Sequence, residues 1–301
     1  MLVCVSACLP VCLSKPIVPP PGTGVRPARG GLARTLRGVR IVSRVQDYEL
    51  EAAHYDETRG GVARARAAAD AVLELLPADC AVLVDVACGT GIVSELLAAP
   101  GRTVIGVDSA AAMLALALPR LGGGGRVVRG DATRLPLATG SVDAVTFMWL
   151  LHLVDEALVA SAIAEAARVL RPGGMMITTV DKNAAQYETD SDVGEILRSA
   201  RRQLAPPASD DVERVGELAA AVGLQPAGLA GYVGHGQGRP PREWARRVRE
   251  DIAWTREADP ARVAEICRAL EALPEQEVRR ADPVYKVAGF RLGGTAATTS
   301  P

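Results

Sequence analysis

The sequence lacks several features that mark particular classes of protein. Aromatic residues make up only 3% of its 301 residues, within an otherwise globular composition of 49% hydrophobic and 23% charged residues. No pair of the six cysteines has the C-x-x-C spacing of a zinc site or a redox motif, so no metal site is expected. No apolar run is long enough to cross a bilayer as a helix. These absences argue against a membrane protein and a zinc protein.

The sequence also lacks an excess of charge of either sign. Its 34 basic residues nearly balance its 35 acidic residues, for a net charge of −1. Nucleic-acid binders usually carry a strong basic field, so no nucleic-acid partner and no membrane partner are expected. The default interpretation of these cysteines is that they are free thiols, as in proteins of the reducing cytoplasm. We therefore expect the protein to be cytoplasmic.

The N-terminal segment has the composition of a disordered extension. Its first thirteen residues are apolar, but they have no basic start and lead to no A-x-A cleavage site. Residues 16–31 are rich in proline and glycine and cannot bury a core. We therefore expect a disordered extension over residues 1–45 and one folded domain over residues 46–301.

Short apolar runs alternate with helical segments from residue 62 onward. A helix ending before Pro77 is predicted to bury Val62, Ala65, Ala69, Val72, Leu73 and Leu76. Strands are predicted over 81–86, 103–107, 126–129, 144–150 and 175–180, with helices between them. This alternation predicts an α/β fold with a Rossmann-like, doubly wound, mainly parallel sheet. Ligands of such sheets bind at the carboxyl ends of the strands.

The alternation stops after the fifth predicted strand. Residues 183–210 are polar and are predicted to be irregular, and two amphipathic helices are predicted within 240–280. Two further strands over 224–233 and 284–290 complete a sheet of seven. We expect 183–210 and 240–280 to be insertions that form a cap.

A glycine turn follows the first predicted strand. The residues Asp85-Val86-Ala87-Cys88-Gly89-Thr90-Gly91 close the strand and open a helix, where a ligand can approach the glycines and the outward N–H groups closely. Nucleotide-binding folds use such a turn, but an ordinary strand-to-helix connection fits the same pattern. The turn by itself leaves both interpretations open.

Acidic residues end the second and third predicted strands. Asp108 follows the glycine turn by about twenty residues, where its carboxylate can accept both hydroxyls of a ribose. Oxidoreductases that use NAD and methyltransferases share this feature. Asp131 is placed to accept the exocyclic amine of an adenine, with the Ala132 N–H facing a ring nitrogen. The alternative is that Asp131 caps a turn before Leu135-Pro136.

Five segments resemble the class I S-adenosylmethionine-dependent methyltransferases, especially the small-molecule enzymes related to the ubiquinone and menaquinone methyltransferases. In chain order they are VLVDVACGTG, VIGVDSAAAMLALA, VVRGDATRLPL, DAVTFMWLLHLVD and AEAARVLRPGGMMITT. The resemblance is close from Tyr48 to Val180 and holds only in outline beyond. It implies a small-molecule substrate, S-adenosyl-L-methionine as the cofactor and S-adenosyl-L-homocysteine as its product.

The resemblance also implies a set of cofactor contacts. Gly89 and Gly91 would contact the methionine part of the cofactor, and Asp108 its ribose. Asp131 and Ala132 would contact the adenine. The complete expected set is Tyr55, Arg59, Asp85, Ala87, Cys88, Gly89, Gly91, Asp108, Ser109, Met113, Asp131, Ala132 and Phe147.

Several of these contacts carry a more specific expectation. Asp85 would orient the glycine turn and reach the cofactor's amino group. Ala87 replaces the first glycine of the family's G-x-G-x-G, and its methyl group is expected to forbid strained backbone angles. Tyr55 could face the positively charged sulfonium, and Arg59 could pair with the methionine carboxylate, unless this segment is only an exposed helix start. Met113 could pack on the adenine or belong to the core.

The segment after the fourth strand is expected to face the methyl acceptor. Transfer from a sulfonium to an O- or N-nucleophile depends mainly on positioning. His152 is the candidate general base for a hydroxyl, or else a histidine that packs in this loop. Phe147 and Trp149 could line the pocket or fill the core. The segment lacks the Asn/Asp-Pro-Pro-aromatic motif that holds a flipped base, which argues against a nucleic-acid substrate.

Two other classes of function stay open at this stage. A nicotinamide-dependent oxidoreductase would need a hydride-transfer constellation after the fourth strand, which the sequence does not show. A protein that binds S-adenosylmethionine without catalysing methyl transfer is the other alternative.

Overall fold

The computed structural model describes residues 54–58, 60–122, 126–250 and 252–293. All of these described residues belong to one compact unit. The expected extension over residues 1–45 and the expected cofactor contact Arg59 lie outside the described residues.

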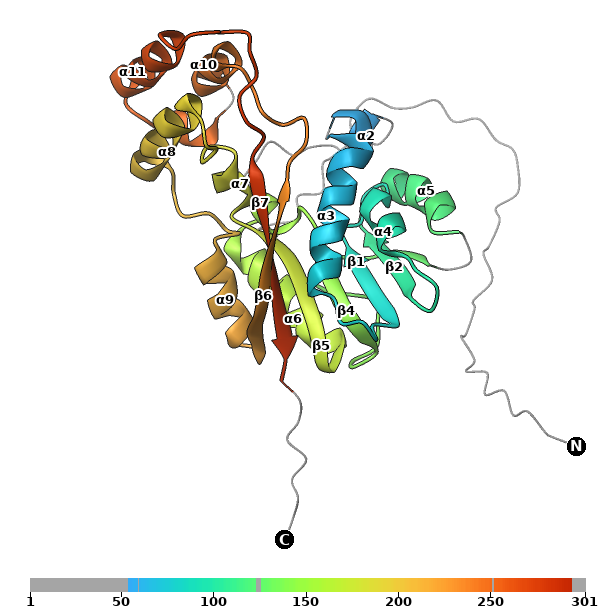
Figure 1. Ribbon diagram of the computed structural model, residues 1–301. Helices are drawn as coiled ribbons and strands as arrows, with labels where there is room; N and C mark the ends of the chain where they lie inside the picture. Colours follow the sequence, from blue (N-terminus) through green and yellow to red (C-terminus); the bar gives the residue numbers. More distant parts are fainter. Residues whose placement is uncertain (1–53, 59, 123–125, 251, 294–301) are drawn as a thin grey trace, which may run out of the picture. The chain divides into compact units, whose positions relative to one another are not determined.

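Seven strands of this unit form one sheet with the order β3-β2-β1-β4-β5-β7-β6 (Figure 1). The strands are β1 (Val82–Val86), β2 (Thr103–Asp108), β3 (Val127–Arg129), β4 (Val142–Phe147), β5 (Leu170–Val180), β6 (Leu224–Val233) and β7 (Val284–Leu292). Strands β1 to β5 pair in parallel, whereas β7 runs antiparallel to both β5 and β6. The predicted Rossmann-like, mainly parallel sheet of seven strands is confirmed.

Helices cover both faces of the sheet (Figure 1). The helices of the described chain are α2 (Tyr55–Thr58), α3 (Gly61–Leu75), α4 (Ile92–Leu97), α5 (Ala111–Arg120), α6 (Glu156–Val169), α7 (Lys182–Ala185), α8 (Asp192–Leu204), α9 (Val212–Ala220), α10 (Pro241–Glu250) and α11 (Pro260–Glu271), and α8, α10 and α11 do not cover the sheet. One hydrophobic core joins the sheet to α6 and α9, and a second joins it to α3 and α4. Among the described residues, no helix is both long and apolar enough to cross a membrane.

Strand β1 contributes to both cores because successive side chains of a strand point to opposite faces. Val84 and Val86 belong to the core under α6 and α9, and Leu83 belongs to the core under α3 and α4. None of the three is more than 1% exposed, as expected for a parallel strand covered on both faces. Burial of one such side chain stabilises the fold by about 1.5–3 kcal/mol.

The strand order also determines where a ligand can bind. The chain winds from β1 through β2 to β3 on one side and from β4 onward on the other, so β1 and β4 are neighbours. Open α/β sheets bind ligands outside the carboxyl ends of the strands at this reversal. The carboxyl ends of β1, β2 and β4 are therefore the expected place for a site.

The prediction for helix α3 is right for four of its six residues. Ala65, Ala69, Val72 and Leu76 are at most 8% exposed, whereas Val62 is 62% exposed and Leu73 is 37% exposed. Arg64, which was not predicted, is also buried. Four buried alanines in this helix let it approach the sheet closely, and the long apolar stem of Arg64 passes into the interface.

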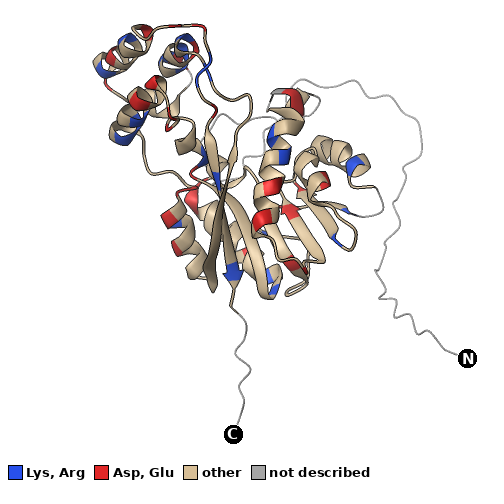
Figure 2. Ribbon diagram, in the orientation of Figure 1, with Lys and Arg blue, Asp and Glu red and all other residues tan. Residues whose placement is uncertain are grey.

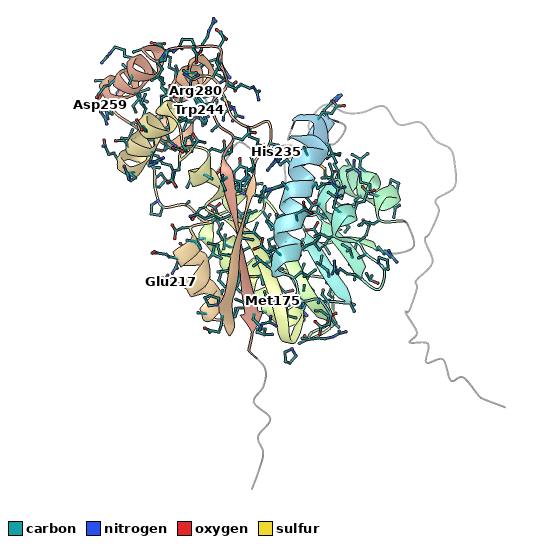
Figure 3. The ribbon with its side chains drawn as sticks, viewed as in Figure 1. Met175, Glu217, His235, Trp244, Asp259 and Arg280 are labelled. Atoms are coloured by element: carbon teal, nitrogen blue, oxygen red, sulfur yellow. The ribbon has the colours of Figure 1, made fainter. Side chains whose placement is uncertain are left out.

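Helices α8, α10 and α11 pack on one another in a separate hydrophobic core. This core includes Leu197, Trp244 and Ile266, and Figure 3 labels Trp244 within the group. The helices come from the segments 183–210 and 240–280, which were expected to form a cap. The two segments thus contribute to one helical unit.

The prediction that residues 183–210 are irregular is wrong, because α8 occupies thirteen of them. The hydroxyl of Ser191 caps this helix by accepting a hydrogen bond of 3.0 Å from the Gly194 N–H. The Arg280 guanidinium pairs with the Asp192 carboxylate at its first turn, with an Nε–Oδ1 distance of 2.8 Å. Charges of both signs cover this helix and its neighbours, whereas the strands of the sheet carry few (Figure 2).

Candidate functional site

A cavity lies at the carboxyl ends of β1, β2 and β4. It holds about 720 Å³ of empty space, a volume that includes the part that opens to solvent. Its lining residues are Tyr55, Asp85, Ala87, Cys88, Gly89, Thr90, Ile92, Val93, Asp108, Ser109, Met113, Met148, Trp149, Leu150 and Leu153. The expected contacts among them are Tyr55, Asp85, Ala87, Cys88, Gly89, Asp108, Ser109 and Met113.

The turn after β1 holds three residues in left-handed backbone conformations. The φ angle is 57° at Ala87, 56° at Gly89 and 77° at Gly91. The expectation that the Ala87 methyl group forbids such angles is therefore wrong. A left-handed conformation costs an alanine about 1–2 kcal/mol, which the rest of the turn must offset. The Cys88 N–H, for example, donates a hydrogen bond of 3.1 Å to the carbonyl oxygen of Val107.

The two glycines of this turn have different surroundings. Gly89 lines the cavity, and a Cβ atom there would stand 4.0 Å from the Tyr55 ring. Gly91 does not line the cavity, and a Cβ atom there would lie 3.0 Å from Cα of Ala117 in α5. Gly89 therefore keeps space open for a ligand, and Gly91 lets α4 begin close to α5.

The Asp108 carboxylate lies at the end of β2 in the wall of the cavity. Its Oδ2 accepts a hydrogen bond of 2.8 Å from the Gly89 N–H, and its Oδ1 accepts one of 2.9 Å from the Ala110 N–H. Each carboxylate oxygen has a second lone pair with which it can accept a hydroxyl. Asp108 thus orders the turn after β1 and can still bind a ribose.

The Asp85 carboxyl group is buried at the end of β1, with 1% of the residue exposed. Ser94 Oγ donates to Oδ2 at 2.5 Å, and Thr146 Oγ1 donates to Oδ1 at 2.8 Å. Burial raises the pKa of Asp85 to about 6, although these two hydrogen bonds lower it. A carboxyl group in this position gains its charge most readily when a cation is beside it.

Tyr55 and Met113 form an apolar wall on the other side of the cavity. Met113 is 1% exposed and packs with Ala110, Ala112 and Tyr55 in a small cluster. Met113 is therefore both a core residue and a lining residue, so the two alternatives considered for it are compatible. Tyr55 comes from α2, which brings an aromatic ring to the cavity.

Trp149 lines the cavity just after β4 and has a φ of 65°, which is rare for a bulky residue. Its backbone N–H donates to Thr179 Oγ1 at 3.1 Å, and its Nε1 donates to the Tyr232 hydroxyl at 2.6 Å. The guanidinium of Arg64 lies over the indole, 3.9 Å from the ring centroid. Strained backbone of this kind persists only where the surroundings hold it, and here one contact holds the backbone and two hold the indole.

Besides Gly91, three of the expected cofactor contacts lie outside the lining of the cavity. Asp131 is exposed, and its Oδ1 accepts 2.8 Å hydrogen bonds from the backbone N–H and the hydroxyl of Thr133, which is the turn-capping arrangement. Ala132 packs against the core under α6. Phe147 is fully buried in the same core.

His152 also lies outside the lining, although its neighbour Leu153 belongs to it. Its Nε2 atom is 3.0 Å from Nζ of Lys182, a residue that is only 8% exposed. The Lys182 N–H donates to the Asp210 carboxylate at 2.7 Å, and burial raises the pKa of this carboxyl. His152 is thus part of a polar cluster beside the cavity wall.

Several lining residues were not predicted as contacts. They are Thr90, Ile92, Val93, Met148, Trp149, Leu150 and Leu153, of which only Trp149 was considered for the pocket. Ile92 and Val93 follow the glycine turn directly, and Leu150 and Leu153 are three residues apart after β4. Their position next to a predicted strand end was the signal available in the sequence. Residue type gives no further signal, because apolar residues occur both in the core and in the lining of a pocket.

Comparisons with known proteins agree with this geometry. Residues 84–178 match a family model described as Methyltransferase domain. A demethylmenaquinone methyltransferase of Clavibacter sepedonicus is 41% identical over 97 residues, which are 32% of this chain and 39% of the relative. One of Thermobifida fusca is 32% identical over 154 residues, which are 49% of this chain and 64% of the relative.

A solved methyltransferase in complex with the Trm112 methyltransferase activator of Haloferax volcanii has the same fold. It is 18% identical, with a TM-score of 0.50 over 84% of this chain and 100% of that chain. The present chain spans 39% and 64% of the length of the two curated relatives. The strand order, the cavity and these matches identify a class I S-adenosylmethionine-dependent methyltransferase domain. It is related to the quinone methyltransferases.

Proposed function

We propose that this protein transfers a methyl group from S-adenosyl-L-methionine to an oxygen or nitrogen atom of a small molecule, with release of S-adenosyl-L-homocysteine. The matched methyltransferase domain supports the class of reaction. The acceptor is proposed from the cavity and from what the relatives' names say they act on.

The observation that carries this proposal is the charge of the cavity. Asp85 and Asp108 are the two ionisable carboxyl groups of the described lining, which includes no lysine, arginine or histidine. S-adenosylmethionine brings a sulfonium and an ammonium, and both favour nearby carboxylates. The empty space beside Gly89 and the apolar wall of Tyr55 and Met113 also fit a nucleoside with an amino-acid chain.

The same observation weighs against a nicotinamide-dependent oxidoreductase. NAD carries a pyrophosphate, and the described lining of the cavity offers it no basic side chain as a partner. The dinucleotide-binding fold also has strand order 3-2-1-4-5-6 with parallel strands, whereas here an antiparallel β7 lies between β5 and β6.

Several residues in and beside the cavity are proposed to position the reactants. The cofactor supplies an activated methyl group when bound, so the protein's main work is to align it with the acceptor. Asp108 is proposed to hold the ribose, and Asp85 to face the amino group. Arg64 and Tyr232 fix the Trp149 indole in the cavity wall, where it excludes water. His152 remains the proposed base for a hydroxyl acceptor.

The proposed acceptor has an apolar, planar part. Met148, Trp149, Leu150 and Leu153 make the side of the cavity beyond β4, and an indole offers a flat surface for stacking. The demethylmenaquinone methyltransferases are named for a quinone-type substrate. A quinol, whose hydroxyl oxygens could accept the methyl group, is therefore the first acceptor to test, and neither nucleic acid nor membrane is part of the proposal.

The experiment is a pair of measurements on the purified full-length chain. Isothermal calorimetry compares S-adenosylmethionine, S-adenosylhomocysteine and NAD, and we expect binding of the first two only. The protein is then incubated with methyl-labelled S-adenosylmethionine and a panel of phenols, quinols and amines, and mass spectrometry detects labelled product. Binding of NAD and of neither S-adenosyl compound would overturn the proposed cofactor assignment. Cofactor binding with no product from any acceptor class would favour a non-catalytic binding protein.

A further inference from the structure

The Asp56 carboxylate joins α2 to two other segments. Its Oδ1 accepts a hydrogen bond from Thr90 Oγ1 at 2.6 Å, and its Oδ2 accepts one from Arg120 Nη2 at 2.6 Å. Arg120 Nη1 donates in turn to the carbonyl oxygen of Thr90 at 3.0 Å and to its Oγ1 at 2.8 Å. Asp56, Thr90 and Arg120 form a closed set of hydrogen bonds, which we call the α2 latch.

The latch is sheltered from water. Thr90 is 2% exposed, and the side chains of Asp56 and Arg120 are 22% and 30% exposed. Hydrogen bonds between ionised groups are shorter and stronger than those between neutral groups, and partial burial weakens the screening by salt. Glu95 also lies near the guanidinium, but at 3.8 Å. Asp56 is therefore the nearer carboxylate to Arg120.

The latch connects segments that border the cofactor cavity. Tyr55, next to Asp56 in the chain, lines the cavity and packs with Ala110 and Met113. Thr90 lines it from the turn after β1, and Arg120 is the last residue of α5. The position of the Tyr55 ring relative to the turn thus depends on the bonds that Asp56 makes.

Helix α2 depends on contacts with other segments for its position. It contains four residues, far below the length at which a helix is stable by itself in water. Gly60 and Gly61 precede and begin α3 with φ angles of 94° and 56°, a backbone region that glycine enters and leaves at low cost. Gly60 also lies close to the carbonyl oxygen of His235, which Figure 3 labels near the start of α3.

We propose that Asp56 is a positioning residue, which holds α2 through Thr90 and Arg120 so that Tyr55 covers the cofactor. The inference rests on the proposed function, since it assigns the cavity to S-adenosylmethionine. Loss of the carboxylate frees α2 and uncovers one side of the cavity. The cofactor and its product then dissociate faster, while the acceptor side beyond β4 is unchanged.

The first arm of the test measures α2 directly, without cofactor. Hydrogen exchange with mass spectrometry follows the peptide that contains residues 54–58 in the full-length wild type and in Asp56→Ala. We expect faster exchange of this peptide in Asp56→Ala and unchanged exchange of β1 and β4. The control is Asp70→Ala, which removes an exposed aspartate of α3. Its peptide pattern should match that of the wild type.

The second arm measures cofactor binding. Asp56→Ala should weaken the binding of S-adenosylmethionine and S-adenosylhomocysteine by roughly 10- to 100-fold, since two charge-assisted hydrogen bonds are lost. The KM for the cofactor should rise similarly, whereas kcat at saturating cofactor should change by less than about threefold. In a double-mutant cycle, Tyr55→Ala should add little to Asp56→Ala, because both remove the same cover.

The outcomes separate the two proposals. Cofactor affinity of Asp56→Ala within about twofold of the wild type, or effects of Asp56→Ala and Tyr55→Ala that add fully, would overturn the role of Asp56. If the wild type binds no S-adenosylmethionine, the proposed function fails, and the exchange of α2 still decides whether Asp56 holds this helix. If Asp56→Ala does not fold, Arg120→Met removes the same ion pair from the other side and is expected to show the same two effects.

Discussion

The backbone N–H of Gly89 donates a hydrogen bond of 2.8 Å to Oδ2 of Asp108, which joins the turn after β1 to the end of β2. The same carboxylate accepts the Ala110 N–H at 2.9 Å just before α5 begins. One side chain therefore orders both segments that border the cavity. It also faces the space in which a ribose would lie.

Asp108→Ala is expected to remove measurable binding of S-adenosylmethionine. The substitution removes the carboxylate proposed to bind the ribose and releases the glycine turn. Together these losses should weaken cofactor binding by at least about 100-fold. Calorimetry measures the affinity, and a thermal melt confirms that the protein is folded. Asp108→Asn retains one acceptor oxygen and should give an intermediate affinity. Unchanged affinity of Asp108→Ala would overturn the cofactor assignment.

Asp85 should make the stability of the cofactor-free protein depend on pH. Burial raises the pKa of this carboxyl from 3.8 to about 6, so ionisation is harder in the folded state than in the unfolded state. Its contribution to stability is fully present below the unfolded pKa and is lost as the pH rises through about 6. Relative to Asp85→Asn, the wild type should lose about 1.4 kcal/mol of unfolding free energy between pH 5 and pH 7.5.

Urea unfolding of both proteins at several pH values between these limits measures this difference. Glu74→Gln, at an exposed position of α3, is the control and should show no comparable trend. A constant difference between wild type and Asp85→Asn across this range would show that Asp85 does not titrate there.

The parts of the site that were predictable lie within short segments of sequence. Asp85, Gly89 and Asp108 lie at or just after the ends of strands that are predicted from apolar runs. Parallel strands bring their carboxyl ends to one edge of a sheet. Local spacing therefore places these residues together. The approximate positions of the strands followed from the same alternation of apolar runs and helices, whereas their order in the sheet was not predicted.

The parts that were not predictable depend on contacts between distant segments. Asp56 and Arg120 are 64 residues apart, and His152 and Lys182 are 30 residues apart. Neither pair has a spacing that a helix or strand would impose. The left-handed backbone of Trp149 also has no local signal, because it is held by side chains from other elements.

Ala87→Gly should stabilise the protein. Glycine relieves a left-handed conformation that costs alanine about 1–2 kcal/mol, but it also gives the unfolded chain about 0.4–1 kcal/mol more conformational freedom. We expect a net gain of about 0.5–1 kcal/mol in unfolding free energy by urea titration. Ala67→Gly, inside α3, is the matched control and should destabilise by about 0.5–1 kcal/mol. Equal losses in both variants would mean that Ala87 is not strained.

His152→Gln separates the two interpretations of this histidine. If His152 accepts a proton from the acceptor hydroxyl, kcat should fall by about 100-fold or more, with cofactor affinity unchanged within about twofold. Nζ of Lys182, a basic side chain, lies 3.0 Å from Nε2 of His152. Lys182→Gln should therefore shift the pH at which kcat is half-maximal, while His152→Gln should abolish that dependence. If kcat of His152→Gln stays within about threefold of the wild type, His152 only packs against α7, and an acceptor that needs no base becomes the better hypothesis.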